Sequence, residues 1–325
     1  MAQADLLRRL ADGEFHSGEV LARQLGVSRT AVWKQLAGLE KLGVALESVR
    51  GRGYRIPGGI DLLDADRVRE RLTVKAAALL EALILDDAID STNAALLREA
   101  PPAEGRARVR SAERQLAGRG RRGRTWASPY ARNLYVSAAW TFAAGAAALE
   151  GLSLAVGVAL AEALDDLALP RVALKWPNDL LADGRKLGGV LIEMTGDAAG
   201  PCRAVVGIGI NVAMPQSLAA AVEQDWTDLA SLGGGDPPER SVLLAAVLNR
   251  LLPLLAGFES DGFARWRSRW EALHAHAGVP VQVVIGGTPV AGVARGVDDR
   301  GALCLETATG EHRIHGGDVS LRPEG

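Results

Sequence analysis

The sequence predicts an α+β protein of three parts, and three patterns along its 325 residues support this. Residues 1–58 combine helical periodicity with a hairpin pattern, residues 64–275 mix strand-like and helical stretches, and residues 278–325 alternate apolar and polar positions between glycine turns. We therefore expect a helix-turn-helix with a β wing, a central mixed α/β domain and a small antiparallel barrel, with boundaries at those residues.

Composition indicates a soluble globular chain, with 48% apolar and 23% charged residues. The longest uncharged apolar stretches, 138–149 and 151–161, are shorter than the roughly 20 residues that span a bilayer. The first residues lack the apolar core and cleavage site of a signal peptide. Cys202 and Cys304 lie too far apart for a disulfide framework or a metal cluster. We expect a cytoplasmic protein that does not enter a membrane.

Charge is unevenly distributed. Residues 1–57 hold nine Lys/Arg and six Asp/Glu, a net +3, whereas the whole chain carries −2, so the remainder carries −5. A basic N-terminal part on an acidic body predicts a polyanionic partner for that part alone.

Three short helices are expected in residues 1–58, called the head below: 4–10, 18–25 and 29–42. Ser17 and Ser28 are placed to cap the second and third. Val32, Leu36 and Leu39 share the inner face of the third helix. Its early residues then remain for DNA base edges, as in a helix-turn-helix: Ser28, Arg29, Thr30, Trp33 and Lys34.

A hairpin is expected after Gly43, with Arg50 and Arg52 at its tip. Cationic side chains on a wing suit contact with DNA phosphates. The same pattern also fits a small trihelical module that contacts proteins through a solvated basic face.

The stretch GRGRRGR, the glycine–arginine loop (residues 118–124), fits G-x-G-x-x-G. A dinucleotide-binding turn is excluded because no helical period follows at 125–129 and no acid lies about twenty residues on. A kinase is excluded because the chain has neither an HRD-like nor a DFG motif. Glycine N–H groups and arginines together suit an anion, which would order an otherwise mobile loop. An exposed basic turn or an RNA-binding tract remains possible on this motif alone.

Three further stretches place polar residues at strand ends. DSTN (90–93) lies between an apolar run and a helix expected near Ala94, and KWPND (175–179) ends a strand because Pro177 stops it. Lys186 begins another strand-like run, and the strand 205–212 contains Gly207 and Gly209, which permit close approach of a ligand or another backbone. A helix cap, a solvated lysine and an ordinary buried strand are the alternatives.

Gln115, GRGRRGR-x-W, KWPND, RKLGG and GIGIN, in this order, resemble the bacterial biotin–protein ligases. With the head, nearly the whole chain is similar to the bifunctional subgroup that also represses biotin synthesis genes. The resemblance implies a class II synthetase-like catalytic domain and an SH3-like C-terminal domain. It also implies two steps: biotin and MgATP give biotinyl-5′-AMP, which then acylates a lysine of biotin carboxyl carrier protein.

The resemblance also implies residue roles. Lys186 contacts the α-phosphate, Arg119, Arg121 and Arg122 fold over carboxylate and phosphates, and Asp179 helps to hold Mg²⁺. Lys186, Arg119 and Arg121 are thus the expected catalytic residues. The remaining biotin-binding residues are Ser91, Thr92, Asn93, Gln115, Gly118, Gly120, Trp126, Gly188, Gly207 and Gly209. The ATP- or adenylate-binding residues are Lys175, Asn178, Asp179, Asn211 and Trp226.

We hypothesise that the protein is a ligase while carrier is available and an operator-bound homodimer once biotinyl-AMP accumulates. Two other readings remain at this stage. One is a lipoate-type protein ligase, and the other is a biotin-sensing regulator without transferase activity.

Overall fold

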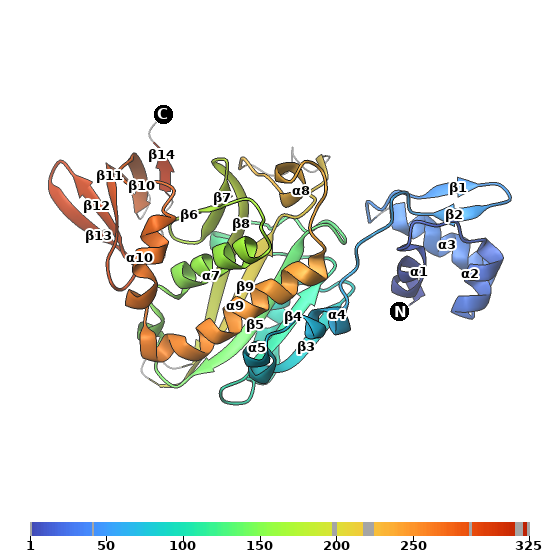
Figure 1. Cartoon of the computed structure of the whole chain (residues 1–325), viewed down its shortest axis with the longest axis horizontal. Helices are drawn as coiled ribbons and strands as arrows, with labels where there is room; N and C mark the ends of the chain where they lie inside the picture. The colour runs from blue at the N-terminus through green and yellow to red at the C-terminus, as the bar shows by residue number, and fades with distance from the viewer. Residues whose placement is uncertain are drawn as a thin grey trace.

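The computed structural model describes residues 2–40, 42–196, 200–216, 224–285, 288–315 and 321–323. It contains a two-stranded, a seven-stranded and a five-stranded sheet. The head lies at one end of the molecule and the C-terminal strands at the other, with the large sheet between them (Figure 1).

The head contains α1 (Ala2–Leu10), α2 (Gly18–Leu25), α3 (Arg29–Glu40), β1 (Glu47–Val49) and β2 (Gly53–Arg55). The predicted caps are present: Ser17 Oγ accepts from Val20 N at 3.2 Å, and Ser28 Oγ accepts from Ala31 N at 3.1 Å. The apolar face of α3 is buried against α1 and α2 as its spacing predicts, and the two strands form the predicted hairpin. The winged helix-turn-helix is therefore formed.

The central sheet is mixed, with strand order β3-β4-β5-β9-β8-β7-β6. β3 and β4 pair in parallel and every other neighbouring pair is antiparallel. The strands are β3 (Leu80–Asp86), β4 (Ala107–Ala112), β5 (Leu134–Phe142), β6 (Ala173–Lys175), β7 (Asp179–Ala182), β8 (Arg185–Gly196) and β9 (Cys202–Ile210). This agrees with the mixed α/β domain that the sequence predicts.

Helices cover both faces of this sheet. On one face lie α7 (Leu152–Asp166) and α9 (Arg240–Asp261), which cross the sheet side by side (Figure 1). On the other, α6 (Thr92–Arg98) packs Leu96 against Ala139 of β5 and Val205 of β9. Because strand residues alternate between faces, Gly207 and Gly209 lie on the α6 face with Val205.

The remaining helical elements of the described chain are short. They are α4 (Ala65–Glu70), α5 (Val74–Leu79), η1 (Arg121–Gly123), η2 (Ala146–Leu149), α8 (Leu229–Leu232) and α10 (Ala264–Ala272). By length and hydropathy the segments 146–166 and 240–261 would suffice to cross a membrane, but 61% of each is buried inside the protein. They are core helices.

The C-terminal sheet is antiparallel, as the alternating pattern predicts, with order β13-β12-β11-β10-β14. Its strands are β10 (Pro280–Ile285), β11 (Thr288–Val297), β12 (Leu303–Thr307), β13 (Gly310–Ile314) and β14 (Leu321–Pro323). Val281, Val283, Leu303 and Leu305 are fully buried and join the core of the central domain. The C-terminal strands are therefore packed onto that domain.

Candidate active site

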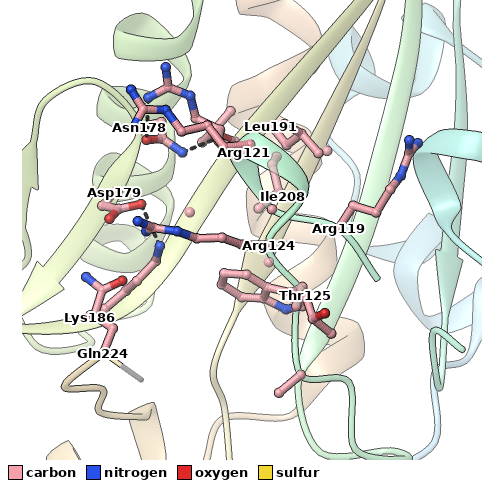
Figure 2. Close-up of a pocket in the computed structure, with 18 of the residues that line it drawn as sticks. Arg119, Arg121, Arg124, Thr125, Asn178, Asp179, Lys186, Leu191, Ile208 and Gln224 are labelled. Atoms are coloured by element: carbon pink, nitrogen blue, oxygen red, sulfur yellow. Dashed lines mark hydrogen bonds and ion pairs between the residues drawn. The ribbon is translucent and has the colours of Figure 1, made fainter. Parts of the chain in front are cut away.

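A cavity of about 1010 Å³ opens where the predicted motifs converge. Its walls come from the N-terminus of α6, the glycine–arginine loop and its flanks, the β6–β7 turn, β8, β9 and the segment 224–226 (Figure 2). These segments are far apart in the sequence. They meet because the antiparallel order β9-β8-β7-β6 brings the KWPND turn, the RKLGG strand and the GIGIN strand together.

One end of the cavity is lined by amide and hydroxyl groups. Gln115 Oε1 accepts from Thr92 N at 2.9 Å and from Thr92 Oγ1 at 3.1 Å. Ser137 Oγ, on β5, lies 2.7 Å from Thr92 Oγ1 and 2.5 Å from Asn93 Oδ1. Ser91 caps α6, which therefore begins at Thr92, two residues before the position that the sequence suggested. DSTN is thus both a helix cap and a cavity wall.

The two strand glycines make room for side chains. A Cβ added at Gly207 would lie 2.3 Å from Asn93 Oδ1, and one added at Gly209 would lie 2.5 Å from Trp126 Cε2. The close approach that these glycines predict is therefore an approach by Asn93 and Trp126. No larger residue fits at either position without displacing a cavity wall.

The opposite end of the cavity is charged. Lys186 Nζ lies 2.7 Å from Asp179 Oδ1, with 19% and 13% of the two side chains exposed. A carboxylate has several acceptor sites, so Asp179 keeps acceptor capacity beside this ion pair. The Lys186 ammonium also stands 5.5 Å from the centre of the Trp126 ring. Arg121 donates to Asn178 Oδ1 at 3.3 Å.

The arginines of the loop point in different directions. Arg119 pairs with Glu193 at 3.1 Å and points away from Lys186 and Asp179, whereas Arg124 extends toward that pair (Figure 2). Glu193 is further held by Asn93 Nδ2, which donates to it at 2.8 Å. Arg119 therefore lies at the edge of the cavity, away from the Lys186–Asp179 pair.

The segment 224–227 runs beside Lys186. Lys186 N donates to Asp225 O at 3.0 Å and Thr227 N donates to Lys186 O at 2.9 Å, so Trp226 lies alongside the lysine. Asn211 Nδ2 donates to Thr227 O at 3.1 Å, which fixes the end of β9 to the same segment. Between β9 and this segment the structure describes residues 211–216, and residues 217–223 lie outside the described chain.

The cavity brings together all but two of the residues that the resemblance assigned to ligand binding. Gly118 and Gly188 are the two that do not line it. A Cβ at Gly118 would lie 2.8 Å from Trp126 O, and one at Gly188 would lie 2.7 Å from Gly209 O. Both glycines therefore serve tight backbone packing directly behind the cavity.

Arg124, Gln224, Leu191 and Ile208 are among the lining residues that were not singled out from the sequence (Figure 2). Arg124 belongs to the GRGRRGR run, so the motif contained it, but spacing alone does not show which arginines turn inward. Leu191 pairs with Gly207 and gives the cavity an apolar side chain near Asn93, whereas the Ile208 side chain alternates with the two glycines and belongs to the core on the other face of the sheet. In sequence they are ordinary strand residues, and no local signal distinguishes them.

The expected DNA-contacting residues form an exposed surface on the head. Arg29, Thr30 and Lys34 are exposed on α3, and 61% of Trp33 is exposed. Arg50 and Arg52 are exposed at the tip of the β1–β2 hairpin, and the Arg52 guanidinium lies 4.1 Å from the Phe15 ring. Ser28 differs, because its hydroxyl is used as the helix cap.

Three family models match the chain. The model described as the biotin/lipoate A/B protein ligase family matches residues 87–211, an HTH domain matches residues 2–55, and the biotin protein ligase C-terminal domain matches residues 276–322. The catalytic match includes the DSTN, GRGRRGR, KWPND and GIGIN stretches of the cavity.

Relatives extend the similarity to the whole chain. The bifunctional ligase/repressor BirA of Escherichia coli K12 is 42% identical over 318 residues, covering 98% of this chain and 96% of that protein. The biotin–[acetyl-CoA-carboxylase] ligase of Paracoccus denitrificans is 39% identical over 237 residues, 71% of this chain and 96% of that protein.

A solved structure gives the same result. The biotin protein ligase from Aquifex aeolicus in complex with biotin and ATP aligns with a TM-score of 0.63 and 30% identity, over 75% of this chain and 100% of that one. The cavity motifs, the head and the full-length similarity agree. The chain belongs to the biotin protein ligases, and within them to the bifunctional ligase/repressor group.

Proposed function

We propose that this chain adenylates biotin with MgATP in the cavity and transfers biotin to a lysine of biotin carboxyl carrier protein. The observation on which this rests is the order of surfaces along the cavity: polar at Thr92 and Gln115, apolar where Trp126 covers Gly209, and charged at Lys186 beyond the Trp126 ring. Biotin has the same order, because its ureido ring, apolar chain and carboxylate follow one another. The ureido ring would meet the amide and hydroxyl groups, and the carboxylate would reach the charged end.

In the first step, a biotin carboxylate oxygen attacks the α-phosphorus of ATP, the bond to the bridging oxygen breaks, and pyrophosphate leaves. Negative charge gathers at the α-phosphate, so stabilisation by a fixed cation favours the transition state. Lys186 is the best-placed cation, since Asp179 and the 225–227 segment hold it in position. Arg121 and Arg124 would approach the phosphates from the loop, and Trp226 would pack against the adenine.

Asp179 is the residue that fits Mg²⁺. Its carboxylate is 13% exposed at the charged end of the cavity, where Oδ1 pairs with Lys186, and Mg²⁺ prefers one or two carboxylates together with phosphate oxygens. Asp179, with Asn178 beside it, would hold the ion that arrives with ATP. The ion would supply neutralisation of phosphate charge. Within the described residues no group of three His, Cys, Asp or Glu side chains forms a separate metal site.

In the second step, the carrier lysine amine attacks the acyl carbon of biotinyl-AMP, an amide forms, and AMP leaves with the electron pair of the broken anhydride bond. The anhydride must be kept from water until the carrier arrives. A glycine–arginine loop that closes over the adenylate would exclude water, and its positive charge would be neutralised by the ligand.

The head supports a second role, an adenylate-dependent repressor of biotin synthesis genes in the cytoplasm. Its exposed α3 residues and cationic wing tip match the geometry by which winged helices contact bases and phosphates. The names of the full-length relatives carry the same two roles. In this proposal, biotinyl-AMP orders loops that complete a homodimer, and the dimer binds operator DNA.

Incubation with labelled biotin, MgATP and a biotin carrier domain tests the ligase. We expect label on one carrier lysine and pyrophosphate release that requires biotin. Preference for lipoate over biotin would instead identify a lipoate-type ligase, and adenylate binding without transfer would identify a regulator alone. Sedimentation with and without biotin and ATP tests the dimer, which is refuted if the protein stays monomeric at saturation.

A further inference from the structure

A buried arginine outside the reaction joins three segments of the chain. Arg240, the first residue of α9, is 2% exposed. Its Nη2 donates to Glu113 Oε2 at 2.6 Å, its Nη1 to Asn133 O at 3.2 Å, and its Nε to Asp61 O at 3.1 Å. A guanidinium with so little access to water depends on these partners to offset its desolvation.

Two of these partners stand at the ends of the segment that carries the glycine–arginine loop. Glu113 comes just before it and Asn133 just after it, and Ala131 N donates to Glu113 O at 2.9 Å, which closes its base. Gln115, two residues beyond Glu113, forms the polar end of the cavity through its bonds to Thr92. The base of the loop is therefore anchored on Arg240.

The third partner belongs to the linker (residues 59–63), which connects the head to the central domain (Figure 1). Ile60 N donates to Ala11 O of the head at 3.0 Å. The next residue, Asp61, accepts from Arg240 N at 2.6 Å through its carboxylate. Consecutive linker residues thus bind the head and the central domain.

Two more contacts strengthen this junction. Leu63 N of the linker donates to Glu113 Oε1 at 2.7 Å, so Glu113 is bonded to both Arg240 and the linker. Tyr130 and Ala131, at the end of the loop segment, lie in the same hydrophobic cluster as the core of the head. The base of the loop and the head are therefore joined by hydrophobic packing as well as through Arg240.

We propose that Arg240 is a positioning residue that couples the order of the glycine–arginine loop to the seating of the head on the central domain. The inference rests on the proposed function, because it takes biotinyl-AMP as the ligand that orders the loop. Closure of the loop shifts Glu113 and Asn133 at its base. The buried guanidinium must keep its hydrogen bonds, since water cannot replace these partners, so it transmits the shift to Asp61. The adenylate then fixes the orientation of the head within one chain, in addition to any effect on dimerisation.

Hydrogen exchange of the full-length protein, with and without a non-transferable sulfamoyl analogue of biotinyl-AMP, tests this. We expect the analogue to slow exchange in residues 118–126 and, together with them, to slow the amides of Leu63 and Arg240 by about tenfold or more, because local opening becomes rarer. Asp61→Ala removes a 38% exposed carboxylate, and with it the bond from Arg240 N and the 3.7 Å ion pair with the guanidinium, while the Asp61 carbonyl remains. In this variant the loop should still be slowed but the linker by less than about twofold.

Two further variants sharpen the result. Arg240→Lys keeps the charge but loses the planar fork, and it should uncouple the linker as Asp61→Ala does. Arg250→Met is the matched control, because Arg250 lies on α9 like Arg240. The variant removes ion pairs with Asp166 and Glu162 of α7, and it should behave as the native protein. The proposal is overturned if the analogue slows linker exchange as much in both Asp61→Ala and Arg240→Lys as in the native protein. It is also overturned if, in the native protein, the analogue slows exchange in the loop but not in the linker. If the analogue does not slow exchange in the loop of the native protein, the result counts instead against the proposed function.

Discussion

Replacing Lys186 by methionine removes the cation from the charged end of the cavity while keeping most of the side chain's length and its packing over Trp126. Its direct structural loss is the 2.7 Å contact with Asp179. If Lys186 stabilises the charge that gathers on the α-phosphate, the variant loses rate in adenylation and keeps most of the biotin affinity, because the ureido end lies at the other side of the cavity.

The magnitudes follow from the burial of the pair. Loss of one charge-stabilising donor costs about 10²–10³-fold in rate, or about 3–4 kcal/mol. Breaking a fully buried ion pair costs roughly 3–5 kcal/mol of stability, but these side chains are still 19% and 13% exposed, so we expect about 1–2 kcal/mol. The double variant Lys186→Met with Asp179→Asn should recover the stability, since no carboxylate is left unpaired, but not the rate.

The assay separates the two steps. Pyrophosphate release with biotin and MgATP reports adenylation, transfer from synthetic biotinyl-AMP to the carrier reports acylation, and calorimetry reports biotin affinity. We expect the loss in pyrophosphate release, with the dissociation constant of biotin changed by less than about threefold. Adenylation within tenfold of the native rate would refute the assignment of Lys186, and so would a loss explained wholly by weaker biotin binding.

Three further predictions follow from the same structure. Gly209→Ala places a Cβ 2.5 Å from Trp126 and should weaken adenylate-analogue binding by about tenfold or more in calorimetry, whereas Gly157→Ala, whose Cβ meets a leucine at 3.4 Å, should not. Burial lowers the pKa of His274 from 6.5 to about 4, so the unfolded chain takes up its proton first and the free energy of unfolding should fall by up to about 3 kcal/mol between pH 6.5 and 4. Urea titrations should show this slope, and His274→Phe should lack it. Arg52→Ala should lower the slope of log K against log salt for operator DNA by about 1, and an unchanged slope would exclude a phosphate contact by the wing tip.

Local sequence signals determined the head and the strand ends. The helix Gly18–Leu25 with its Ser17 cap, and the hairpin with Arg50 and Arg52 at its tip, follow from spacing and capping within a few residues. Such features depend on neighbours in the chain, so they survive without knowledge of the tertiary structure. The same holds for KWPND at a strand end. The domain boundaries drawn from these patterns remain predictions.

The tertiary structure decided which side chains meet. GRGRRGR predicts an anion site, but the directions of its arginines depend on the folded loop, in which Arg124 extends toward Lys186 and Arg119 toward Glu193. Likewise, Gly207 and Gly209 signal close approach, but the approaching groups come from α6 and from the loop.

The junction of the head is the furthest from any sequence signal. Asp61 and Arg240 are 179 positions apart, and neither residue belongs to a recognisable motif. An isolated arginine in a sequence is ordinarily read as a surface residue, because burial of its charge is costly. It becomes a buried anchor here because the mixed sheet and α9 bring two carboxylates and two carbonyls to one point. Long-range chain topology, and no local pattern, supplies those partners.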